Sequence, residues 1–184
     1  MQRLPPWLQN ELTHWSTVLV VGLVLLFSLA PESLVEKLSL TQAGILGGEY
    51  WRLWTSQIVH LSVNHALLNA AGFAIVSLSF RQEVTPLKEI VVLLISMLGV
   101  GLGIFLWIKE IGWYVGLSGA IYGVLVHHLL LGFKRTPVIA GGFLLYVLGK
   151  VIYGQFFATP DNAIEQFIGG AVAEDAHLYG SVMC

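Results

Sequence analysis

Long apolar runs constrain the fold of this chain more than any other feature of its sequence. A helix that crosses a bilayer core needs roughly 20 apolar residues, and the chain holds about six runs near that length. They cover residues 15–30, part of 62–80, 90–108, 114–133, 137–157 and 168–184. With 56% apolar and only 11% charged side chains among 184 residues, the chain has too few ionic groups to coat a water-soluble globule. The sequence therefore predicts an all-α, polytopic membrane protein with six transmembrane helices, forming a single membrane domain over residues 1–184.

Charge and cysteine content narrow the classes of function. The formal net charge of −2 and the pI near 6.3 show no basic excess of the kind that nucleic-acid binding needs. We therefore expect the lipid bilayer as a partner and no nucleic acid. The one cysteine, Cys184, has no second cysteine with which to form an internal disulfide.

Lysine and arginine residues set the expected orientation, because cytoplasmic loops carry an excess of both. If the amino terminus lies inside, more cations fall on the inner face than on the outer one. The inner set is Arg3, Arg81, Lys88, Lys134 and Arg135, and the outer set is Lys37, Arg52 and Lys109. In this orientation Ser118 and His177 lie at the external ends of the fourth and sixth helices.

Ser118 lies in the stretch YVGLSGAIYGVLVH, where glycines flank a hydroxyl near the start of an apolar helix. Two interpretations fit this pattern. Small residues such as Gly119 and Gly123 allow membrane helices to pack closely, with serine as part of the contact. A serine hydroxyl next to a base is also a nucleophile. The stretch alone leaves both interpretations open.

The second predicted helix carries an unusual set of polar residues within HLSVNHALLNAAG, namely His60, Asn64, His65 and Asn69. Polar side chains at membrane depth cost free energy unless they are paired, so they indicate a functional site. His65 and Asn69 are four apart and share one helical face, from which both can donate to one developing negative charge. The alternative is that they hydrogen-bond to neighbouring helices.

The six histidines are also candidates for a metal site. His60 and His65 are roughly 140° apart around a helix, so they do not form the i, i+4 pair of a helical zinc motif. His127 and His128 are adjacent and face different directions. Because the sequence has neither an HExxH pattern nor a thiolate cluster, we expect no catalytic metal and no cofactor.

The stretch EDAHLYG near the end of the chain contributes His177 and Gly180. Ser118 and His177 are expected at similar depth, since both lie at external helix ends. Without side chains, Gly119, Gly123 and Gly180 let the fourth and sixth helices approach closely enough for a hydrogen bond between Ser118 and His177. The glycines then serve packing and chemistry together.

The segment EYWRLWT, between the first two apolar runs, is expected at the external surface of the membrane. Tryptophan and tyrosine favour the membrane–water interface, where a ring is apolar on one side and hydrogen-bonded on the other. Glu49 and Arg52 are three residues apart, and we expect them to brace this loop internally.

Together these motifs resemble those of the rhomboid intramembrane serine proteases, and the likeness spans nearly all of the chain. The patterns H-x4-H-x3-N in the second helix, G-x-S-G at the start of the fourth and A-H-x-x-G in the sixth occur here in the family's order. Each is weak alone, but together in a six-helix chain they are specific. The resemblance implies a rhomboid-like bundle and a hydrolase that cleaves transmembrane protein substrates by a Ser-His dyad.

Carried over position by position, the resemblance makes Ser118 the nucleophile and His177 its general base. It forms the oxyanion hole from the Ser118 backbone N–H and the side chains of His65 and Asn69. Glu49 and Arg52 match the acid and the arginine of the family's first loop, which implies a structural role.

The resemblance also assigns supporting positions around the dyad. Tyr122, one turn after Ser118, is expected to stack against the His177 ring, and Gly116 and Gly119 shape the turn. Asp175 is two residues from His177 and is expected to point away from it, so we do not expect it to be a third catalytic member.

The residues Asp-Ala-His-Leu around His177 are similar to those of the rhombosortases of Gram-negative bacteria. That resemblance implies cleavage near a C-terminal Gly-Gly sorting tail that ends in a transmembrane anchor. The enzyme would lie in the inner membrane, with its site open to the periplasm. A general rhomboid protease with other substrates, a non-catalytic rhomboid-like chaperone and a small transporter stay as alternatives. Counted from residue 168, the last helix holds about 17 residues, the short limit for a span, so it is expected either to be short or to continue beyond Cys184.

Overall fold

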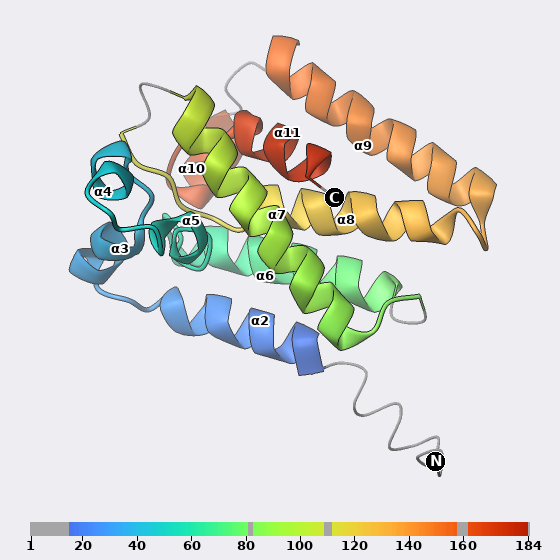
Figure 1. The fold of residues 1–184 in the computed structure, drawn as a ribbon, viewed down its shortest axis with the longest axis horizontal. Helices are drawn as coiled ribbons and strands as arrows, with labels where there is room; N and C mark the ends of the chain where they lie inside the picture. The colour runs from blue at the N-terminus through green and yellow to red at the C-terminus, as the bar shows by residue number, and fades with distance from the viewer. Residues whose placement is uncertain (1–14, 81–82, 109–111, 158–161, 184) are drawn as a thin grey trace.

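The computed structural model describes residues 15–80, 83–108, 112–157 and 162–183. Within these ranges the chain is helical, and its β pairing is one isolated bridge between Leu40 and Tyr114. Figure 1 shows the helical arrangement, and the prediction of an all-α fold is confirmed. The predictions that involve Arg3, Arg81, Lys109 and Cys184 fall outside the described residues.

Longer helices form the body of the described chain. They are α2 (Trp15–Phe27), α6 (Val63–Ser79), α7 (Pro86–Trp107), α8 (Ser118–Gly132), α9 (Pro137–Phe157) and α11 (Glu174–Val182). Among the described helices, α7 and α9, with 22 and 21 residues, are long and apolar enough by themselves to cross a membrane. The apolar helices α2, α6 and α8 are shorter. Short helices α3 (Glu32–Leu38), α4 (Gln42–Leu46), α5 (Arg52–Thr55) and α10 (Asn162–Ile168) connect them.

The prediction that one helix covers residues 168–184 is wrong. α10 ends at Ile168, and α11, which has nine residues, begins only at Glu174. Gly169 has a φ of +87°, the left-handed conformation that ends a helix, and its amide donates to the carbonyl of Glu165 at 2.9 Å. Residues 168–173 are all apolar or glycine, so the apolar run concealed the break.

The fourth helix begins later than predicted, at Ser118 and not at Tyr114. Tyr114 instead pairs with Leu40: each amide donates to the other's carbonyl, at 2.9 and 3.1 Å. Gly116 then takes a φ of +113°, which the following turn requires. Ser118 is therefore the first residue of α8, held by a segment tied to a distant loop.

The loop between α2 and α6 is braced by Arg52, as the sequence predicted. Its Nε donates to Glu49 Oε2 at 2.5 Å. Its Nη1 donates to the carbonyls of Glu36 and Ser39, at 2.8 and 2.6 Å. One guanidinium thus joins α3, α5 and the turn between them.

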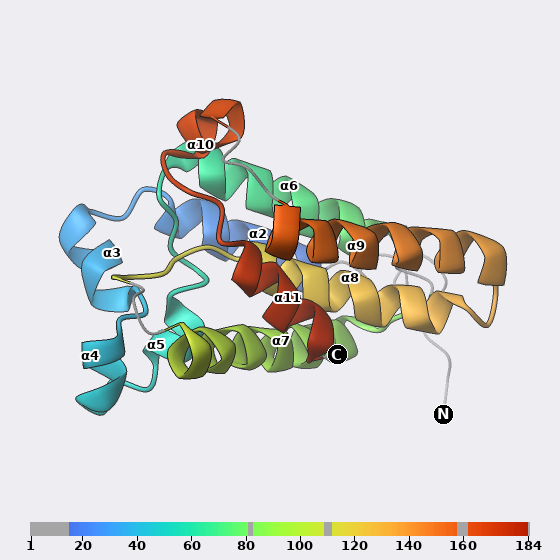
Figure 2. The ribbon, with the colours of Figure 1, turned by 90° about the horizontal axis from the view of Figure 1, so that it is seen from above.

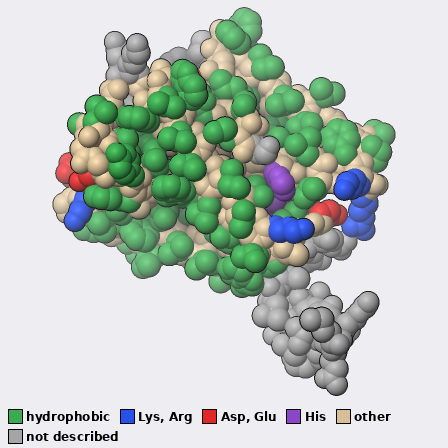
Figure 3. Space-filling view, in the orientation of Figure 1, with side chains coloured by type: hydrophobic (Ala, Val, Ile, Leu, Met, Phe, Trp, Pro, Cys, Tyr) green, Lys and Arg blue, Asp and Glu red, His purple; other side chains and the backbone are tan. Residues whose placement is uncertain are grey.

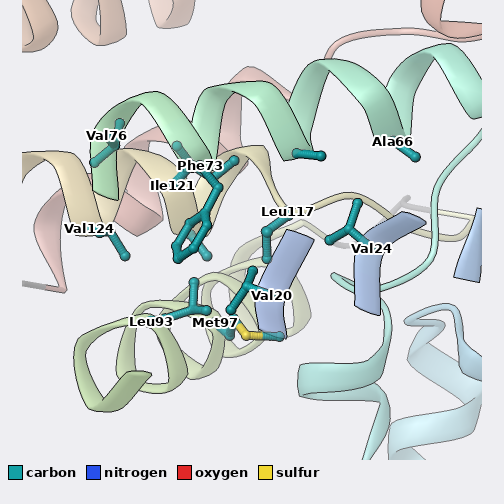
Figure 4. Packing of buried hydrophobic residues seen from close by; sticks show 12 residues of the cluster. Val20, Val24, Ala66, Phe73, Val76, Leu93, Met97, Leu117, Ile121 and Val124 are labelled. Carbon is teal, nitrogen blue, oxygen red and sulfur yellow. The ribbon is translucent and has the colours of Figure 1, made fainter. Parts of the chain in front are cut away.

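α8 is the central helix of the bundle. It packs against α6, α7, α9 and α11, while α2 packs against α6 and α7. Figure 2 shows α11 between α7 and α9. Apolar side chains of α2, α6, α7 and α8 meet in the core drawn in Figure 4, among them Val24, Phe73, Met97 and Val124.

Glycines allow α8 and α11 to touch backbone to backbone. A Cβ on Gly119 would lie 2.6 Å from the Ala176 carbonyl oxygen, and one on Gly123 would lie 2.7 Å from that of Gly180. A Cβ on Gly180 would overlap the Gly119 carbonyl oxygen. Small residues permit this approach in membrane helices, and here any side chain would separate the pair.

Apolar side chains cover much of the outer surface, as Figure 3 shows for one face. On α9, Val138, Leu145 and Phe156 are 86%, 74% and 76% exposed. Water-soluble monomers rarely expose apolar patches of this extent, whereas lipid chains accept them. The surface and the apolar helices together indicate a membrane protein.

Five of the six described cations divide between the two ends of the bundle, and the sixth, Lys150, lies within α9. Lys88 lies at the start of α7, and Lys134 and Arg135 follow α8, at the end where α2 begins (Figure 1). α3 and α5, which carry Lys37 and Arg52, lie at the opposite end. This division agrees with the sides predicted for these five residues, and the direction of the bundle in the membrane stays a prediction.

Gly180→Ala tests the contact between α8 and α11. We expect it to destabilise the detergent-purified protein by about 1–3 kcal/mol, because the new methyl overlaps the Gly119 carbonyl. The measurement is thermal unfolding. Gly149→Ala on α9 is the matched control, since a Cβ there has no neighbour within 4 Å. In water, Ala in place of a helical Gly gains roughly 0.5–1 kcal/mol, so the control should unfold no earlier than wild type. Equal unfolding temperatures for the two variants would contradict the contact.

Candidate active site

The turn that precedes α8 is fixed by hydrogen bonds on both sides of Gly116. Its amide donates to the Ser56 carbonyl at 3.0 Å, and its carbonyl accepts from the Tyr114 hydroxyl at 2.9 Å. A Cβ on Gly116 would lie 2.7 Å from Cε1 of His65. Glycine is thus needed here both for its positive φ and for the approach of the His65 ring. The turn presents Ser118 at the amino-terminal end of α8.

Ser118 and His177 meet across the contact between α8 and α11. The Ser118 Oγ lies 3.1 Å from Nε2 of His177, at hydrogen-bond distance. The His177 side chain is buried, and Ser118 is partly exposed to the adjoining cavity. The Tyr122 ring stacks on the imidazole, with centroids 4.4 Å apart and planes 19° apart. This geometry suits a hydroxyl whose proton is taken by a neighbouring base.

The other nitrogen of His177 has a partner that the sequence analysis missed. Its Nδ1 lies 2.9 Å from Oε2 of Glu174, one turn earlier on α11. Glu174 and His177 are three residues apart and share a helical face, and this spacing was a signal in the sequence. Both ring nitrogens are occupied by Ser118 and Glu174, so neither is paired with Asp175.

His65 and Asn69 lie on the other side of the same cavity. Both side chains are buried, and both line the cavity that Ser118 and His177 also line. The Asn69 amide donates to the His65 carbonyl at 3.0 Å, which leaves its second N–H proton available. The His65 Nδ1 is buried without a hydrogen-bond partner among the described residues. These contacts do not test the oxyanion-hole role of His65 and Asn69, which stays a prediction.

The cavity has a volume of about 1220 Å³ and is mostly apolar at its edges. Leu68, Ile121 and Tyr153 supply apolar wall, while Lys150 contributes a cation. The Lys150 Nζ donates to the Tyr122 hydroxyl at 2.9 Å. An apolar cavity with a few convergent polar groups is typical of a binding or active site.

His60 lies beside this site and stays neutral. Its ring meets that of His65 edge to face, with centroids 4.9 Å apart. Burial, and then the neighbouring His65, lower the pKa of His60 to about 3. Within the described residues, no group of three or more His, Cys, Asp or Glu side chains is arranged to hold a metal ion.

A comparison with models of protein families identifies the family of this chain. The family model described as the Rhomboid domain matches residues 47–184 of this chain. The matched stretch covers more than half of the sequence and runs from α5 to α11. It therefore includes the cavity and the side chains that meet there.

Gly116→Ala tests how closely the turn controls Ser118. Strain from the positive φ and overlap with the His65 ring should displace the hydroxyl. We expect the rate at which a fluorophosphonate probe labels Ser118 to fall at least about tenfold, equivalent to roughly 1.4 kcal/mol. Gly112→Ala is the control, because a Cβ there has no neighbour within 4 Å. Wild-type labelling by the Gly116 variant would refute this dependence.

Proposed function

Because the chain belongs to the rhomboid family of intramembrane proteases, we propose that it is a serine endopeptidase in which Ser118 and His177 carry the reaction. The single observation that supports this most strongly is the 3.1 Å distance between Ser118 Oγ and His177 Nε2, at the wall of an apolar cavity. A serine hydroxyl is a weak nucleophile at neutral pH, and a neutral imidazole within this distance can accept its proton.

The proposed reaction has two halves. In the first, His177 Nε2 takes the Ser118 proton while Oγ bonds to the substrate carbonyl carbon. The tetrahedral intermediate collapses, the peptide C–N bond breaks, and His177 gives its proton to the leaving amine. In the second, water attacks the acyl-enzyme with the same base, and the carboxylic acid leaves as Ser118 regains its proton.

Negative charge on the former carbonyl oxygen needs donors in both halves. We assign them as the Ser118 backbone N–H with the side chains of His65 and Asn69. His65 and Asn69 line the same cavity as Ser118, which supports the assignment. A single such donor is commonly worth about 3 kcal/mol of transition-state stabilisation.

The membrane frame of the proposal uses six helices. We take α2, α6, α7, α8, α9 and α11 as the six membrane helices of a single domain, although the nine described residues of α11 are fewer than the roughly 20 that a full crossing needs. The rhomboid family acts on transmembrane substrates within the bilayer. The cation distribution supports an orientation in which the cavity opens to the external side, the periplasm if the membrane is a bacterial inner membrane.

A rhombosortase-like specificity is the narrower part of the proposal. The Asp-Ala-His-Leu sequence around His177 supports it, and the substrates would carry a Gly-Gly tail followed by a transmembrane anchor. A general rhomboid protease would cleave transmembrane segments without that tail. A non-catalytic chaperone fits less well, because both Ser118 and His177 are present and in contact.

Ser118→Ala is the direct test. We expect cleavage of a transmembrane peptide with a Gly-Gly tail to fall more than about a thousandfold, since the nucleophile is gone. The assay follows product formation in detergent micelles, with Ser79→Ala at the exposed end of α6 as control. Undiminished cleavage by the Ser118 variant would disprove the mechanism. Equal cleavage of a peptide without the tail would leave the protease assignment and remove the narrower specificity.

Acidification should abolish cleavage, because a protonated imidazole has no lone pair with which to take the Ser118 proton. His60 does not account for this loss, because its pKa of about 3 lies below the range from about pH 5 to 8 over which cleavage is measured. The measurement is the pH dependence of kcat/KM at constant ionic strength. A profile that stays flat from about pH 5 to 8 would contradict His177 as the base.

A further inference from the structure

Among the described residues, Glu174 is the ionisable side chain bonded to His177 that the proposed dyad does not use. Its Oε2 lies 2.9 Å from Nδ1, while Nε2 on the opposite side of the ring faces Ser118 at 3.1 Å. A carboxylate only accepts hydrogen bonds, so the proton of the neutral imidazole must lie on Nδ1. The lone pair then lies on Nε2, where Ser118 needs it.

α9 gives the Glu174 carboxylate a fitted place. A Cβ on Gly154 would lie 2.6 Å from Oε2 of Glu174, so glycine is what leaves room for the group. One turn earlier on α9, Lys150 bonds to the hydroxyl of Tyr122, whose ring stacks on His177. The carboxylate thus lies between α9 and α11, with the Glu174 side chain 28% exposed, and its negative charge lies near the cation of Lys150.

We propose that Glu174 is a positioning residue that completes a Ser118–His177–Glu174 arrangement. This proposal rests on the proposed protease function. It holds the tautomer with Nε2 unprotonated, fixes the ring over Tyr122, and stabilises the imidazolium that forms when Nε2 takes the serine proton. No proton moves to the carboxylate: it stays ionised throughout, and Nδ1 keeps its hydrogen.

Other titratable groups lie near His177. They include Lys150 of α9, Tyr122 of α8 and His65 of α6. Asp175 precedes His177 by two residues on α11, but it bonds to neither ring nitrogen. α7 packs against α11 near Gly99 and Gly103, whereas its charged residues, Lys88 and Glu89, lie in its first turn. Among these groups Glu174 is the anion bonded to the ring.

The first test compares Glu174→Gln with Asp175→Asn, which removes the same charge one residue away. The readout is the rate of Ser118 labelling by a fluorophosphonate probe across pH, with thermal unfolding measured in parallel. We expect Glu174→Gln to lower the rate at neutral pH at least about tenfold and to move the acidic limb about one unit or more to lower pH. The acidic limb moves to lower pH because the imidazolium has lost the anion that stabilised it. Asp175→Asn should change the labelling rate by no more than about twofold, and it should leave the acidic limb in place.

A second variant displaces the carboxylate without altering it. Gly154→Ala should lower the labelling rate in the wild-type background and have no further effect in the Glu174→Ala background, because the group it displaces is absent there. Gly149→Ala, in open space on the same helix, is the control. An additive loss from Gly154→Ala would assign it to general packing and overturn the proposal.

Further outcomes separate this inference from the protease assignment. Three results would overturn the role of Glu174 alone. They are labelling of Glu174→Gln at a rate within twofold of wild type, an equal loss of labelling in Asp175→Asn, and a loss in Glu174→Gln without a shift of the acidic limb. A wild-type chain whose labelling persists in Ser118→Ala would overturn the protease function instead. In that case ¹⁵N-histidine NMR still decides the contact: the downfield Nδ1 proton signal should be present in wild type and absent in Glu174→Gln, and its presence in both would overturn the contact.

Discussion

The backbone contact between α8 and α11 is the constraint on which the rest of the site depends. Gly119, Gly123 and Gly180 bring the two helices so close that their carbonyls fill the places where side chains would start. Only at this separation does a serine at the first residue of α8 reach a histidine in the first turns of α11. Packing between membrane helices gains little from hydrophobicity, because lipid is as apolar as the helices are. Close van der Waals contact therefore sets the geometry of the proposed chemistry.

Two separate groups of polar side chains lie inside the described helical bundle. His177 is hydrogen-bonded to Glu174 and Ser118, and its ring stacks on Tyr122, whose hydroxyl accepts from Lys150. At the other end of the core, Ser16 donates to Glu89 at 2.5 Å, and His128 lies 3.6 Å from the same carboxylate. Ser16, Glu89 and His128 are not among the residues that line the cavity. Their contacts with one another join α2, α7 and α8. Polarity inside an apolar bundle is thus not by itself a sign of catalysis, and access to a cavity separates the two regions.

Much of the fold was predictable because apolar length and glycine placement are local properties of a sequence. The run over 137–157 matches α9 at both ends, and the Glu49–Arg52 brace followed from their spacing. The late start of α8 was not predictable locally, because Tyr114 is held by Leu40, far away in the chain. The break at Gly169 was concealed by its apolar neighbours. For the site, the meeting of Ser118 with His177 followed from helix ends at similar depth. The Glu174 contact also required knowing where α11 begins, since that start sets which acidic residue shares a face with His177.

The distance in sequence between Ser118 and His177 has a consequence for the newly made protein. The two residues that meet at Nε2 are 59 positions apart, and α9 and α10 are synthesised between them. Until α11 has been synthesised, Ser118 is without His177. Under the proposed mechanism, a chain in that state lacks the base and does not cleave. The proposed activity then depends on the docking of α11 against α8.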